Sequence, residues 1–199
     1  MPVGEKKVGL PELFYDLVFV YALSRTTELV HHADEADYAT FLISLVILFT
    51  VWLYQSIYIN RFGDNSWRDR LFLFADMFLL LFLSNTVGSD WLANFVPFNL
   101  ALGLLVGSVC LQYLLQLARH ASPEQRRRIK LVAGLRGLTA AMVLGSLLFP
   151  AHIGQWVALG GFGLGWILPT FVSHKQPAVN FPHLLERLNG LVIIFFGEA

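Results

Sequence analysis

Ionisable side chains lie within long apolar stretches of this 199-residue sequence, and nine of them are candidates for a shared site. They are Glu12, Asp16, Arg25, Asp76, Arg136, His183, Glu186, Arg187 and Glu198. A charge at the centre of a bilayer costs about 2.5–3.5 kcal/mol on insertion scales, so such groups are normally paired, turned toward a bundle interior, or functional. Acids and bases held together in an apolar setting are suited to binding or moving protons and ions. We therefore treat these residues as a candidate intramembrane polar core.

The elements that must hold these residues are membrane-spanning helices. Apolar residues make up 56% of the sequence and charged residues 14%, whereas soluble domains average about 25% charged residues. A helix needs about 20 mostly apolar residues to cross a bilayer. Seven stretches of this kind occur, near residues 10–30, 38–59, 71–87, 92–117, 129–149, 153–172 and 181–199. We therefore predict an all-α fold, a polytopic transmembrane helix bundle that forms a single domain over residues 1–199.

The last stretch reaches the end of the sequence without a polar terminus. A helix that ended at this depth would leave carbonyl groups without partners in lipid. We therefore expect the seventh span to be truncated and the sequence to be a fragment of a longer chain.

The placement of lysine and arginine predicts the orientation of the helices. Eleven of the 14 basic residues fall in the N-terminal segment and in the second, fourth and sixth connections, whereas the first, third and fifth connections have none. Because cytoplasmic loops retain positive charge, this alternation places the N-terminus in the cytoplasm.

This orientation sorts the buried charges by depth. Glu12 and Asp16 lie four residues apart, and therefore on one face of the first helix. Arg187 is expected at a similar depth on the last helix, which runs in the same direction. The simplest pairing joins Arg187 with Glu12 or Asp16, Asp76 with Arg136, and Arg25 with Glu198.

Several chemistries are excluded by what the sequence lacks. Every lysine lies outside the spans, so no retinal-type Schiff base can form there, and no Gly-x-x-x-x-Gly-Lys motif is present. Cys110 is the single cysteine, and the net charge of zero argues against nucleic-acid binding through bulk positive charge. We expect no cofactor, no nucleic-acid partner and no enzymatic activity, with an intramembrane enzyme as a minor alternative.

Histidines and acids also gather in the first connection, at His31, His32, Asp34, Glu35 and Asp37. Such a group is suited to a divalent metal, but a solvated acidic loop is the more frequent arrangement. We therefore expect no metal site.

Two stretches carry a family resemblance. The run from Glu12 to Ala22, Glu-Leu-Phe-Tyr-Asp-Leu-Val-Phe-Val-Tyr-Ala, resembles the N-terminal signature of the bacterial low-temperature-requirement A (LtrA) membrane proteins. The run from His183 to Leu188, His-Leu-Leu-Glu-Arg-Leu, followed by Ile193-Ile194 and Gly197-Glu198, resembles their second signature. Family members are about twice as long, so the resemblance implies an N-terminal half. It implies a multi-pass protein of the bacterial cytoplasmic (inner) membrane, but no substrate and no reaction.

Two functions remain open. The first is a transporter or ion/proton-coupled carrier whose charged core binds a small solute or ion. The second is a membrane sensor or interaction scaffold in which the buried charges only fix how the helices pack. The expected partners are the lipid bilayer, a small solute or ion, and either a second copy of the chain or the missing C-terminal half.

Overall fold

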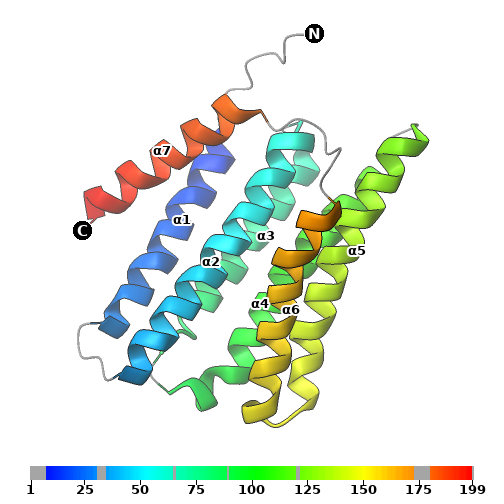
Figure 1. Cartoon of the computed structure of the whole chain (residues 1–199). Helices are drawn as coiled ribbons and strands as arrows, with labels where there is room; N and C mark the ends of the chain where they lie inside the picture. The colour runs from blue at the N-terminus through cyan, green and yellow to red at the C-terminus, as the bar shows by residue number, and fades with distance from the viewer. Residues whose placement is uncertain are drawn as a thin grey trace. The chain divides into compact units, whose positions relative to one another are not determined.

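The computed structural model describes residues 8–30, 35–64, 66–88, 90–119, 122–172 and 180–198. Over these residues it contains helices and no strand, so the all-α prediction is confirmed (Figure 1). The helices are α1 (Leu10–Thr27), η1 (Glu28–Val30), α2 (Glu35–Phe62), α3 (Trp67–Ser84), α4 (Trp91–Gln116), α5 (Pro123–Gly145), η2 (Ser146–Leu148), α6 (Ala151–Val172) and α7 (Phe181–Glu198). Each of the seven predicted spans therefore overlaps one α-helix.

Three of these helices are, by length and composition, able to cross a membrane. They cover Tyr38–Phe62, Trp91–Gln116 and Pro123–Leu148 in the part of the chain that the structure describes. Large apolar side chains are also exposed on other helices, including Phe78 on α3 and Ile193 and Phe196 on α7. Such apolar surfaces suit contact with lipid tails better than contact with water.

The helices group into two compact units. The first comprises Met1–Asn85 and Pro177–Ala199, and the second comprises Thr86–Gln176. The predicted single domain over residues 1–199 stays a prediction.

In the first unit, α1 packs against α2, α3 and α7 (Figure 1). Its apolar side chains Phe19, Val20 and Leu23 are buried. The ring of Phe19 lies with its centroid 5.5 Å from that of Phe49 and 5.9 Å from that of Trp52, both on α2. This packing buries Glu12 and Asp16 of α1 among the neighbouring helices.

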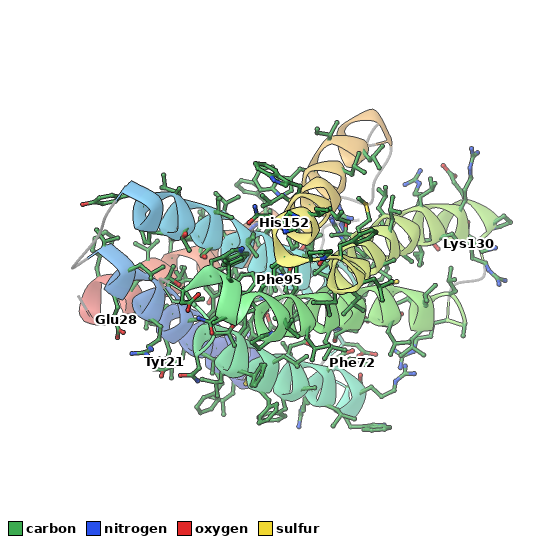
Figure 2. The ribbon with its side chains drawn as sticks, turned by 90° about the horizontal axis from the view of Figure 1, so that it is seen from below. Tyr21, Glu28, Phe72, Phe95, Lys130 and His152 are labelled. Atoms are coloured by element: carbon green, nitrogen blue, oxygen red, sulfur yellow. The ribbon has the colours of Figure 1, made fainter. Side chains whose placement is uncertain are left out.

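In the second unit, α5 packs closely against α4 and α6. Glycine makes this approach possible at Gly154 in the first turn of α6, where an added Cβ would lie 2.5 Å from the carbonyl oxygen of Ser146 and 2.6 Å from the Cζ of Phe95. The Thr139 hydroxyl also lies 3.2 Å from the carbonyl oxygen of Gly161, which links α5 to α6. Figure 2 labels Phe95 and His152 in this region.

The first turns of α5 carry several basic residues. Arg126, Arg127 and Lys130 are exposed there, and Arg128 contacts Glu124 at 2.6 Å. Lys130 is labelled near this end of α5 in Figure 2. Exposure of three basic residues at one helix end fits a position outside the hydrocarbon core.

Candidate functional site

The centre of the candidate site is an ion pair between Asp16 on α1 and Arg187 on α7. The Nε of Arg187 donates to Oδ2 of Asp16 at 3.0 Å, and Nη2 donates to Oδ1 at 2.5 Å. Both residues are about 1% exposed. A guanidinium that meets both carboxylate oxygens is the strongest geometry for such a pair, and it also fixes the orientation of both groups.

Trp52 on α2 adds a third bond to the same carboxylate. Its indole Nε1 donates to Oδ1 of Asp16 at 2.7 Å. The Cζ of Arg187 also lies 5.7 Å from the centroid of the Trp52 ring, within the range of a cation–π contact. Asp16 thus accepts three hydrogen bonds.

A second acid, Glu12, lies one turn before Asp16 on α1. Its Oε2 lies 3.7 Å from Nη1 of Arg187 and 3.2 Å from Nε2 of His183, which is one turn before Arg187 on α7. The Glu12 side chain is 9% exposed. Two acids on α1 therefore face a histidine and an arginine on α7.

Asn60 determines which nitrogen of His183 carries the proton. The side-chain nitrogen of Asn60 donates to the carbonyl oxygen of Asn180 at 2.8 Å, and its side-chain oxygen accepts from the Asn180 backbone N–H at 2.8 Å. These two bonds fix the orientation of the amide. The same Asn60 nitrogen lies 3.2 Å from Nδ1 of His183, so Nδ1 must accept. A neutral His183 therefore carries its proton on Nε2, the atom nearest Glu12.

Asp76 on α3 supplies a third buried acid. It is about 1% exposed, and its charge acts on the fully buried Tyr15 of α1, as do the charges of Arg187 and Asp16. Tyr15 thus lies within electrostatic range of acids on α1 and α3 and of the base on α7. The first unit therefore contains three acids, Glu12, Asp16 and Asp76, in the surroundings of Arg187.

The structure does not bring all nine candidate residues together. Glu186 is exposed on α7. Arg25 contacts Glu28, one turn along the same chain segment, at 2.6 Å, and Figure 2 labels Glu28. The side chain of Glu198, the predicted partner of Arg25, lies outside the described residues.

The predicted pair of Asp76 and Arg136 also stays a prediction, because the two residues belong to different units. Within the second unit, Nη1 of Arg136 lies 3.5 Å from the carbonyl oxygen of Gly165 on α6. His31, His32 and Asp34 lie outside the described residues. Elsewhere in the described chain, no group of three or more His, Cys, Asp or Glu side chains is arranged to hold a metal ion.

Sequence reasoning missed Trp52, Asn60 and Asn180. A tryptophan in an apolar span reads as an ordinary lipid-facing residue, so nothing local marks Trp52. Asn180 carries a signal, because it precedes Phe181-Pro182 in the manner of a helix cap. Its side-chain oxygen indeed accepts from the backbone N–H of His183 at 3.4 Å. Its contact with Asn60, 120 positions away, depends on tertiary packing alone.

The comparison with known proteins gives one result. The model of the family described as bacterial low temperature requirement A protein (LtrA) matches residues 7–199. No curated protein and no solved structure matches the sequence significantly. The match includes both helices that form the candidate site and agrees with the apolar helices of the fold. The chain therefore belongs to the bacterial LtrA family of integral membrane proteins.

Proposed function

We propose that this protein is a multi-pass carrier of the bacterial inner membrane that moves a small solute or ion, coupled to protons or another ion. The observation that carries the proposal is the cluster of buried ionisable side chains around Arg187. Asp16 binds the guanidinium through two bonds, and Glu12 lies beside it with His183 as a further neighbour.

Ionisable groups that are buried together affect one another's protonation. Contacts of 2.5–3.7 Å join Glu12 to His183, Glu12 to Arg187 and Asp16 to Arg187. A change of charge on one of these groups therefore alters the free energy of ionising the others. Uptake and release of a proton or a cation by such a set is the elementary step of a coupled carrier.

The alternative is a sensor or interaction scaffold, and the geometry of Asp16 favours it. With three donors around one carboxylate, the pair of Asp16 and Arg187 is well satisfied and suited to fixing the register of α1 against α7. Glu12, the more exposed of the two acids, brings a second carboxylate and His183 to the same arginine, which a purely structural pair does not require. For this reason we prefer the carrier.

A flux assay distinguishes the two functions. The protein is reconstituted into liposomes that contain a pH-sensitive dye, and a pH gradient is applied with sodium or potassium present. We expect proton movement above that of empty liposomes, and its loss in Asp16→Asn and Arg187→Gln. Glu186→Gln, which changes an exposed acid on α7, is the matched control and should retain the flux. Equal proton movement in protein-containing and empty liposomes under every ion condition would reject the carrier.

A further inference from the structure

We propose that one exposed face of α5 binds an anionic phospholipid. The headgroup phosphate lies at Arg126, Arg127 and Lys130, and an acyl chain lies along the apolar residues that follow them. The inference concerns the second unit alone and does not depend on the carrier. It needs only that α5 lies in a membrane, and the stretch Pro123–Leu148 has the length and composition to cross one.

Three basic side chains share one face of α5 near its start. At 3.6 residues per turn, Arg126, Arg127 and Lys130 fall within an arc of about 100°. All three side chains are exposed, and Figure 2 labels Lys130 at this end of the helix. No ion pair joins any of the three to a described residue, whereas Arg128 between them contacts Glu124 at 2.6 Å. The face therefore presents three positive charges that no carboxylate of the described chain balances.

The composition of the second unit agrees with binding of an anion. Residues 86–176 contain seven lysines and arginines but only two acids, Asp90 and Glu124, so their formal net charge is +5. Asp90 caps the start of α4, where it accepts from the backbone N–H of Ala93, and Glu124 is paired with Arg128. The positive face of α5 is therefore complementary to a negatively charged group.

Cations at this place in a helix are unfavourable on their own. The N-terminal end of a helix carries a partial positive charge, which favours nearby anions and disfavours nearby cations. α5 begins at Pro123, and its N-cap residue Ser122 makes no side-chain capping bond. Arg126 and Arg127 follow within the first two turns. A phosphate bound here would balance the charge of the helix end as well as the charges of the side chains.

The same face continues as a stripe of exposed apolar and small residues. They follow Arg127 at spacings of three or four positions, at Leu131, Gly134, Leu138 and Ala141. Leu131 and Leu138 are 42% and 45% exposed. In the described chain nothing lies within 4 Å of a Cβ placed at Gly134, which leaves room for an acyl chain. A free phosphate would use only the charged end of this face, so the stripe favours a lipid.

Native mass spectrometry of the full chain in detergent measures lipid binding directly. Phosphatidylglycerol should bind more tightly than phosphatidylcholine, whose choline cancels the phosphate charge, and this preference should weaken as the ammonium acetate concentration rises. A basic residue near an anionic surface contributes about fivefold in affinity. We therefore expect Arg127→Gln to weaken phosphatidylglycerol binding about fivefold, and Arg126→Gln/Arg127→Gln/Lys130→Gln to weaken it on the order of 100-fold. Arg68→Gln on α3 also removes one positive charge and is the control that should retain the preference.

Gly134→Leu tests the place of the acyl chain. Because the space around a Cβ at Gly134 is open, the variant should fold as the unsubstituted protein does, while its new side chain occupies the stripe. We expect weaker binding of phosphatidylglycerol. Gly163→Leu on α6, where the space around a Cβ is also open in the described chain, is the control and should bind as before.

Four results would overturn the proposal. Equal affinity of the unsubstituted protein for both lipids is one, and it is the result expected if the basic face binds an acidic protein instead. An undiminished preference in the folded triple variant is the second, and Arg127→Gln decides the same point if the triple variant does not fold. Displacement of the lipid by excess glycerol 3-phosphate would indicate a site for free phosphate. Unchanged binding in Gly134→Leu would reject an acyl chain on the stripe.

Discussion

Arg187 binds both carboxylate oxygens of Asp16, although 171 positions separate the two residues in the sequence. The pair joins α1 to α7, the first and last helices of the described chain, and Trp52 adds a contact from α2. It therefore ties three helices of the first unit together at one carboxylate. The predictions below follow from this arrangement and from the packing of the second unit.

Removing one partner of the buried pair should be strongly destabilising. In Arg187→Gln, the charge of Asp16 remains buried without its guanidinium, and we expect the free energy of unfolding to fall by about 3–5 kcal/mol. The double variant Asp16→Asn/Arg187→Gln should lose less than the sum of the two single changes. Denaturant unfolding in detergent, followed by circular dichroism, measures each value.

Arg25→Gln is the control for this experiment, because its partner Glu28 is exposed. Exposed ion pairs contribute about 0–1 kcal/mol, so this variant should unfold close to the unsubstituted protein. If the loss of unfolding free energy in the double variant equals the sum of the two single losses, Asp16 and Arg187 do not act as a coupled pair.

Trp52→Phe tests the third bond to Asp16. Phenylalanine retains an aromatic ring beside Arg187 but has no N–H to donate, so one hydrogen bond to a charged group is lost. We expect the free energy of unfolding to fall by about 1.5–3 kcal/mol. Trp156→Phe on α6, at a side chain that is 69% exposed, should have almost no effect. If both variants unfold alike, the indole N–H of Trp52 contributes nothing to the site.

Asn60→Ala should loosen the start of α7. The change removes both bonds to the Asn180 backbone and the bond to Nδ1 of His183. We expect faster amide hydrogen exchange in the first turns of α7, because opening of this segment becomes easier. Asn189→Ala, at an exposed position of the same helix, is the control. Unchanged exchange in Asn60→Ala would show that Asn60 does not hold the helix start.

In the second unit, two glycines of α6 should respond differently to alanine. A Cβ at Gly154 would meet the carbonyl oxygen of Ser146 at 2.5 Å, and a backbone atom cannot move away easily. Gly154→Ala should therefore lower the free energy of unfolding by about 1–3 kcal/mol. Nothing lies within 4 Å of a Cβ at Gly163, so Gly163→Ala should be neutral or stabilising by up to about 1 kcal/mol. If Gly154→Ala were more stable than Gly163→Ala, α6 would not approach Ser146 as closely as the structure shows.

The sequence was sufficient to predict the helices and that α1 faces α7. It was not sufficient to predict the hydrogen bonds within the site. Hydropathy marks each span because the bilayer requires long apolar runs. The depths of Asp16 and Arg187 follow from the orientation of their helices, which made their pairing predictable. Arg25 contacts Glu28 because that acid is one turn away, so a local contact is available without any tertiary constraint.

Asn60 and Trp52 could not be predicted, since their roles arise only where α2 meets two other helices. The tautomer of His183 could not be predicted either, because it depends on the orientation of the Asn60 amide and on the bonds of that amide to the Asn180 backbone. These features come from packing between segments far apart in the sequence.

The most direct test of the carrier compares proton flux and stability in one variant, Glu12→Gln. Glutamine has the shape of a protonated glutamate but cannot release a proton, so the variant separates a structural role from an exchanging one. We predict that Glu12→Gln unfolds at the same denaturant concentration as the unsubstituted protein and yet carries no protons into liposomes, while Glu186→Gln retains full flux. A stable Glu12→Gln protein that carries protons as fast as the unsubstituted protein, or an unsubstituted protein that carries none, would contradict the account.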